Sequence, residues 1–128
     1  MERPRYRAAR LTDTRQVDIR AKTFADEAIK QLDFMKDQYG FAGPDVDRGT
    51  SPGVCVSVSY HRDTITIEAS LVLWYMGEEY VAMTRVVHAP DGTARRTKIA
   101  HNTAHTGYQM RQALKLQAEA VRTEIGQR

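Results

Sequence analysis

The chain contains a single cysteine, Cys55, among 128 residues. It can therefore form neither an internal disulfide nor a zinc site built from several cysteines. A chain of this length buries enough apolar surface to fold without such cross-links. Because scarce cysteine is typical of a reducing compartment, we expect the protein to be cytoplasmic.

Long apolar runs are also lacking. The longest strongly apolar stretch, Leu71 to Met76, is far shorter than the roughly 20 residues that a membrane-spanning helix needs. Residues 1–10 carry four arginines, and no apolar segment follows them as it would in a secretory signal. We therefore expect no membrane association.

The eight glycines do not form a phosphate-binding loop. Such a loop lies directly before a helix, whereas Gly40 and Gly43 follow a helical pattern. Gly49 and Gly53 are separated by Pro52 in a stretch without periodicity. We expect no nucleotide bound by this route, and no cofactor.

The net charge of +3 is distributed unevenly along the chain. Residues 1–22 carry seven basic and three acidic side chains, residues 23–94 carry five and eleven, and residues 95–128 carry seven and two. If the two ends pack together, they form a basic pole that suits nucleic acid or an acidic protein. The same charges could instead only solvate helix surfaces.

Apolar residues at three- and four-residue steps predict a long amphipathic helix from Thr12 or Asp13 to Tyr39. The positions on its apolar stripe are Val17, Ala21, Phe24, Ala28, Leu32, Met35 and Tyr39. Gly40 can take the left-handed conformation after the last turn, and Phe41 can then fold back near Met35. Residues 1–11 lack periodicity and are expected to form a flexible basic arm.

Alternation of apolar and polar residues between positions 54 and 88 predicts three antiparallel strands joined by short turns. Residues 93–101 are compatible with a fourth, basic edge strand. Residues 42–53 contain three glycines and two prolines, so we expect a loop there.

A second helix is predicted near the carboxyl terminus. Thr106 and Gln109 form a capping box, and apolar residues then keep to one face. These are Met110, Leu114, Ala118, Val121 and Ile125. We therefore expect residues 12–128 to form a single α+β domain, with a long amino-terminal helix, an antiparallel meander of three or four strands, and a carboxy-terminal helix packed on one sheet face.

Polar residues around the first predicted hairpin include the components of a nucleophilic active site. They are Ser57, Ser59, His61, Asp63 and Glu68. No sharp strand-to-helix turn presents a serine, and Cys55 has no identifiable activating partner. We expect no catalytic residue and no enzymatic activity.

His101 and His105 have a spacing that could hold a metal ion if both lay on a helix. The predicted helix begins after both of them, and the sequence indicates no third ligand. We therefore expect no metal site.

An apolar and acidic group spans the second predicted hairpin. Its members are Trp74, Tyr75, Glu78, Glu79 and Tyr80. Aromatic anchors with a carboxylate rim suit binding of a basic protein partner. The aromatic side chains could also be core residues beneath the terminal helix, because one face of every strand must be buried.

A basic group lies in the last third of the chain. Its members are Arg95, Arg96, Lys98, Arg111 and Lys115. They could follow a nucleic-acid backbone, with Tyr108 available to stack on a base. They form no recognition-helix cluster, so a charged edge strand explains them as well.

The stretch Phe24 to Phe41, read FADEAIKQLDFMKDQYGF, is followed by a loop and then by VSVSYHRDTITIEASLVLW. Over residues 24–88 the chain resembles the small α+β immunity proteins of bacterial polymorphic toxin systems. The markers of this resemblance are Tyr39, Gly40, Phe41, Tyr60 and Trp74. It implies a non-enzymatic, cytoplasmic protein that blocks one cognate toxin through a sheet face or a loop rim.

Three functions stay open at this point. The first is a protein-binding inhibitor of immunity type, which contacts a toxin-like protein through the second hairpin. The second is a nucleic-acid-associated accessory protein that uses the basic pole. The third is a small-ligand binder or enzyme with a pocket in the curled sheet. Self-association also stays open, because an exposed hydrophobic hairpin or a sheet edge could form a symmetric dimer instead of receiving a foreign partner.

Overall fold

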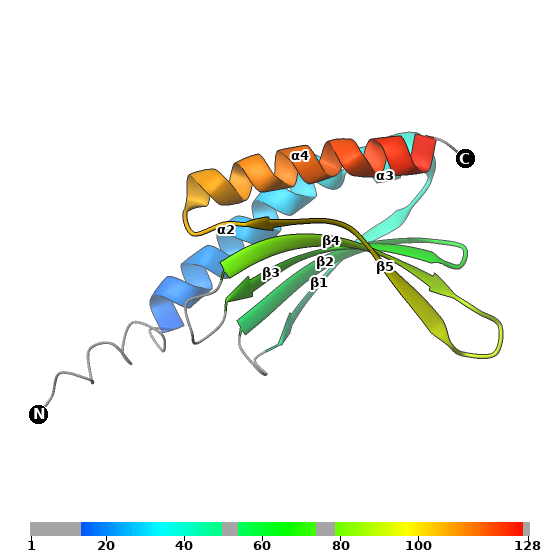
Figure 1. Cartoon of the computed structure of the whole chain (residues 1–128), viewed down its shortest axis with the longest axis horizontal. Coiled ribbons are helices and arrows are strands. Elements are labelled where there is room, and N and C mark those ends of the chain that lie inside the picture. Colours follow the sequence, from blue (N-terminus) through cyan, green and yellow to red (C-terminus); the bar gives the residue numbers. More distant parts are fainter. Residues whose placement is uncertain (1–13, 50–53, 74–78, 127–128) are drawn as a thin grey trace, which may run out of the picture.

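The computed structural model describes residues 14–49, 54–73 and 79–126. In chain order the elements are helix α2 (Thr14–Leu32), helix α3 (Phe34–Tyr39), strands β1 (Ala42–Gly49), β2 (Val54–Arg62), β3 (Ile65–Leu73), β4 (Glu79–His88) and β5 (Ala94–Thr103), and helix α4 (Gly107–Gly126). The strands form one antiparallel sheet in the order β1-β2-β3-β4-β5, and the helices lie together along one side of it (Figure 1). The α+β prediction is confirmed, with five strands instead of three or four.

The predicted amino-terminal helix is divided at Asp33 into α2 and α3. The hydroxyl of Tyr60, on β2, donates a hydrogen bond of 2.9 Å to the carboxylate of Asp33. The predicted end of the helical segment is confirmed, because Gly40 has a φ of 75° and Phe41 is buried. The N–H of Phe41 donates to the carbonyl of Met35, which ties the chain back to the last turn.

The prediction of a loop over residues 42–53 is wrong for its first part, because residues 42–49 form edge strand β1. Pro44 lacks an N–H group, and the pairing of β1 with β2 is irregular between Ala42 and Asp45. A Cβ on Gly43 would lie 2.8 Å from the carbonyl oxygen of Ser59, so only glycine fits this close approach. Glycine and proline therefore mark an edge strand here.

The expected basic strand after the turn at residues 89–92 is confirmed as β5. Gly92 has a φ of 90° and its N–H donates to Ala89. The carboxylate of Asp91 accepts hydrogen bonds from the hydroxyl and the N–H of Thr93, which lower the pKa of Asp91. The turn therefore has the side-chain bonding that its sequence predicts.

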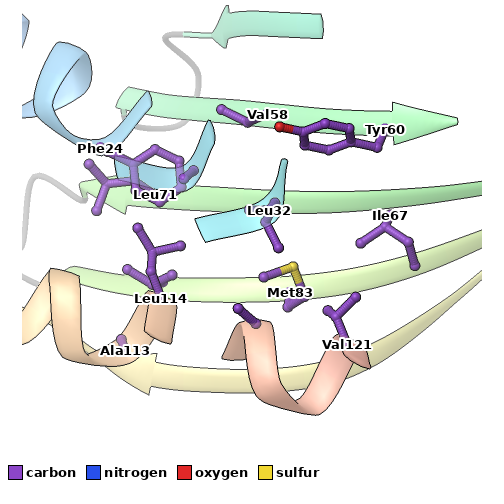
Figure 2. Packing of buried hydrophobic residues seen from close by; sticks show 14 of the residues in the cluster. Phe24, Leu32, Val58, Tyr60, Ile67, Leu71, Met83, Ala113, Leu114 and Val121 are labelled. Carbon is purple, nitrogen blue, oxygen red and sulfur yellow. The ribbon is translucent and has the colours of Figure 1, made fainter. Parts of the chain in front are cut away.

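The apolar core lies between the two long helices and one face of the sheet (Figure 2). Most fully buried side chains come from α2, α4 and the three central strands, and they include Phe24, Leu32, Val58, Tyr60, Ile67, Leu71, Met83, Leu114 and Val121. The apolar stripe predicted for α4 is buried at all five positions. The predicted cap at Thr106 is confirmed, because its hydroxyl accepts from the N–H of Gln109. The reciprocal bond differs from that of a capping box, because the side chain of Gln109 accepts from the N–H of His105 and not from that of Thr106.

Candidate functional site

The second face of the sheet is covered by no helix that the structure describes. We call it the helix-free face. Because side chains alternate along a strand, the strand register defines the rows of residues that cross this face. One row runs Gly49, Cys55, Val72, Tyr80, Thr103, the next runs Asp47, Ser57, Ser70, Ala82, His101, and the third runs Asp45, Ser59, Glu68, Thr84, Lys98.

A hydrogen-bonded chain of four side chains crosses this face from β1 to β4. The Nε2 atom of His61 lies 2.8 Å from the carboxylate of Asp45, and its Nδ1 atom lies 2.9 Å from the hydroxyl of Thr66. The Nε2 atom of His88 lies 3.2 Å from the same hydroxyl. With His61 neutral, one direction of bonding satisfies every group: His88 donates to Thr66, Thr66 to His61, and His61 to Asp45.

These four hydrogen-bonded side chains include the residue types of a nucleophile, a base and an orienting carboxylate. Their geometry suits a structural role better than catalysis. Thr66 is only 8% exposed, and both imidazoles point at its hydroxyl. A nucleophile needs one activating base and access to substrate. The sequence suggests Asp63 and Glu68 as carboxylate partners of His61, but His61 forms a hydrogen bond with neither. Glu68 instead forms an ion pair with Arg96 at 2.6 Å. Among residues 19–49, 55–73 and 79–126, no group of three or more histidine, cysteine or carboxylate side chains could hold a metal ion.

The predicted partner-binding group is described only in part. Trp74, Tyr75 and Glu78 lie outside the described residues. Tyr80 lies on the helix-free face, where its ring packs against His101 with centroids 4.3 Å apart. Glu79 belongs to the other face and is held by Arg20 of α2 at 2.7 Å. His105 lies 3.8 Å from the same carboxylate oxygen, so Glu79 joins α2 to the segment before α4.

An apolar pocket of about 170 Å³ lies between α2, the last part of β3 and the start of α4. Its lining residues are Ile19, Arg20, Thr23, Leu71, Thr106, Gly107 and Met110. We call this part of the molecule the pocket end, because β3 finishes and β4 begins there. Ile19, which lines the pocket, is 54% exposed. The pocket end therefore combines a hollow with an apolar side chain that solvent reaches.

The predicted basic group is not brought together into one surface. Arg96 and Lys98 lie on the helix-free face of β5, opposite Val86 and Thr84. Arg95 is exposed on the other side of that strand, and Arg111 and Lys115 are exposed on α4, in the other layer of the fold. A nucleic-acid backbone that followed β5 would not reach the basic side chains of α4 without bending around the edge of the molecule.

Comparison of the chain with family models, with curated proteins and with solved structures found no match. Within the described part of the chain, neither long helix is apolar enough over its length to cross a membrane. The interpretation of function therefore depends on the site geometry. That geometry includes residues that the sequence does not indicate as functional: Asp45 lies in a stretch whose glycines and prolines predict a loop, and Ile19 and Arg20 carry no signal beyond an amphipathic helix.

Proposed function

We propose that the chain is a non-enzymatic, cytoplasmic protein-binding inhibitor, of the kind that the immunity-protein resemblance implies, and that it receives a toxin-like partner at the pocket end. The observation that carries the proposal is the apolar pocket between α2 and α4, which opens beside the exposed side chain of Ile19. Exposed apolar anchors around a hollow are typical of protein interfaces. The proposed partner contacts are Trp74, Tyr75, Glu78, Glu79 and Tyr80, together with Ile19.

The size of the pocket favours a protein side chain over a metabolite. Pockets for drug-sized ligands usually enclose roughly 300–1,000 Å³. A cavity of about 150 Å³ holds a group the size of benzene. At about 170 Å³ the pocket suits one aromatic or aliphatic side chain of a partner. This supports an anchor site of the kind that dominates the binding energy of protein interfaces.

The ion pair at the rim supports the same proposal. Glu79 is neutralised by Arg20, so a partner group that enters beside the pair meets fixed charges of both signs. A partner with a basic side chain could approach the Glu79 carboxylate, because the Glu79 side chain keeps 22% of its surface exposed beside Arg20. This is a route to selectivity that a purely apolar hollow would lack.

The proposal can be tested by immobilising the full chain and capturing proteins from a lysate of its native host. The variant is Ile19→Asp, and the matched control is Leu116→Asp, because Leu116 is 63% exposed on the outer side of α4, away from the pocket. We expect one protein to be retained by the unmodified chain and by the control, with retention about tenfold weaker for Ile19→Asp, since a charge replaces an apolar contact.

The captured protein is then expressed alone and together with the chain. Inhibition predicts that it stops cell growth alone, that the chain restores growth, and that Ile19→Asp restores it poorly. A captured protein whose activity the chain leaves unchanged would contradict inhibition. Equal retention of the captured protein by the unmodified chain, Ile19→Asp and Leu116→Asp would contradict the pocket end as the binding site. Nucleic acid that is retained by the chain, and lost after Arg96→Glu with Lys98→Glu, would favour the accessory function instead.

A further inference from the structure

We infer that the helix-free face receives a second copy of this chain in a twofold dimer. The axis lies between the two facing sheets and runs parallel to the central strand β3. The inference uses a different surface from the pocket, which belongs to the other layer of the fold; Tyr80 is the one residue that both proposals include. The inference depends on how charge is arranged across the rows of the sheet.

The two edges of the helix-free face carry opposite charge. Asp45 and Asp47 are exposed on β1, whereas Lys98 and Arg96 are exposed on β5. Asp45 and Lys98 lie in the same row, at its two ends. Asp47 lies in the next row. Among the described residues, neither Asp47 nor Lys98 forms an ion pair. The face therefore runs from an acidic edge to a basic edge.

Rotation by 180° about an axis that lies along β3 places the rows of one copy over the same rows of the other and reverses their order. Asp45 of each copy then faces Lys98 of its partner, and this contact occurs twice because the interface is isologous. An axis across the strands would instead place β1 over β1, and would bring Asp45 and Asp47 against the same acidic pair. Charge complementarity therefore selects the axis along the strands.

The centre of the face is suited to close approach. In the rows of Asp45 and Asp47 most side chains between the charged edges are small, namely Ser57, Ser59, Ser70, Ala82 and Thr84. Glu68, on β3, lies at the axis and faces its counterpart in the other copy, and its ion pair with Arg96 of the same copy offsets its charge there.

A fourth row runs Ala42, His61, Thr66, Val86, Arg96. Five strands about 4.8 Å apart and these four rows about 6.6 Å apart give a face of roughly 600 Å² per copy. The total of roughly 1,200 Å² is at the lower limit for specific interfaces, where weak and transient complexes lie, so we expect a Kd in the micromolar range or above and dissociation on dilution.

Symmetric pairing through the sheet edges is disfavoured by the same charges. Two β1 edges would bring together Asp45 and Asp47 of both copies, and two β5 edges would bring together Arg95, Arg96 and Lys98 of both copies. Like charges at an exposed strand are a usual protection against edge-to-edge pairing. The face is thus the part of the sheet where a symmetric contact joins opposite charges.

The test is sedimentation equilibrium of the full chain from about 1 μM to about 1 mM, a range that covers the expected Kd. We expect the average mass to rise toward that of two chains. Asp45→Lys and Lys98→Asp should each raise the Kd about tenfold or more, because each creates two repulsive edge contacts. An equimolar mixture of the two variants should regain the dimer, since every edge contact in the mixed pair again joins opposite charges.

The matched controls are Glu119→Lys and Lys115→Asp, which make the same charge changes at exposed positions of α4. They should leave the Kd within about twofold. Cys55 gives a second measurement, because it lies on the helix-free face in the row of Tyr80, where the partner would cover it. Its alkylation by iodoacetamide should slow as the unmodified chain is concentrated, and should not slow for Lys98→Asp.

Circular dichroism of both edge variants checks that they fold, and Asp47→Lys is a second acidic-edge variant that leaves the bond between Asp45 and His61 intact. A chain that stays monomeric to the highest concentration would overturn the inference. The inference would also be overturned if the α4 controls raised the Kd as much as the edge variants do. The same holds if the mixture of Asp45→Lys and Lys98→Asp did not regain the dimer.

Discussion

The helix-covered face and the helix-free face of the sheet differ in how their buried residues are shielded from water. On the covered face, side chains such as Ile67 and Met83 are enclosed by apolar residues of α2 and α4 (Figure 2). On the helix-free face, Thr66, Ala82 and Val86 are also buried, at 8%, 6% and 4% exposure, with no described helix over them. These three side chains are nearly as buried as the core residues, but a different kind of neighbour shields them from water.

Neighbouring polar side chains provide the cover on the helix-free face. His61 and His88 lie against Thr66, and the ion pair of Arg96 with Glu68 crosses β4 beside Val86. These covering groups themselves reach solvent, and water can replace their contacts at small cost. A buried side chain on this face should therefore contribute less to stability than one with the same exposed fraction beneath the helices. The polar groups that cover it form a surface that another molecule can contact.

The largest expected effect is Met83→Ala, on the covered face of β4. Met83 is fully buried, and loss of its side chain leaves a cavity between the sheet and α4, so we expect the free energy of unfolding to fall by about 3 kcal/mol. The matched control is Thr84→Ala, the next residue on the other face, which should change it by less than about 1 kcal/mol. Urea unfolding measures both, and equal losses would break the comparison of the two faces.

A buried polar residue of the covered face should have the next largest effect. Gln117 of α4 is fully buried, and its side-chain amide donates at 2.9 Å to the carbonyl of Val81 and to the side chain of Asn102. Gln117→Ala removes the side-chain donor from both of these acceptors, so we expect a loss of about 2 kcal/mol. Gln112→Ala, at an exposed position of the same helix, is the control and should have almost no effect. A small loss for Gln117→Ala would mean that water reaches this part of the core.

Tyr60→Phe tests a polar contact at the border of the core. The variant loses the bond to Asp33 and should be about 1 kcal/mol less stable at neutral pH. Burial, and secondarily the bond to Asp33, raise the pKa of Tyr60 in the folded protein. The unfolded chain therefore loses this proton first, so the stabilisation is present below about pH 10 and is lost as the pH rises toward the folded-state pKa.

The difference in stability between the unmodified protein and Tyr60→Phe should consequently narrow above about pH 10. Thermal unfolding at several alkaline pH values measures this change. A difference that stays constant with pH would show that Tyr60 titrates in the folded protein as it does in the unfolded chain.

Much of the architecture could be predicted from the sequence because its signals are local. The stripe of α4, the cap at Gly40 and the alternation in β2 each depend on residues close together in the chain. Strand β1 was missed because glycine and proline near Gly43 and Pro44 normally indicate a loop. Its pairing depends on β2, and no pattern within residues 42–49 indicates that partner.

The candidate site was predictable only in part, for the same reason. His61 and Tyr80 were noted from the sequence, but their contacts with Asp45 and His101 depend on strand register across the sheet. The pocket joins α2 to α4, elements that are more than 80 residues apart at Ile19 and Met110. Neither residue carries a signal beyond its place on a helix, so a hollow between them becomes visible only once the helices are packed.

The smallest expected effect is Thr66→Val, on the helix-free face. The variant keeps the size of the buried side chain and removes the hydroxyl that two imidazoles contact. In the core, leaving two polar groups without a partner would cost about 1–3 kcal/mol. Because His61 and His88 are both exposed, water can satisfy their ring nitrogens, and we expect a change within about 0.5 kcal/mol in urea unfolding. A loss as large as that of Gln117→Ala would show that water does not replace the hydrogen bonds of His61 and His88, as in the core. The side chains of the helix-free face would then be too rigid to adjust to another molecule.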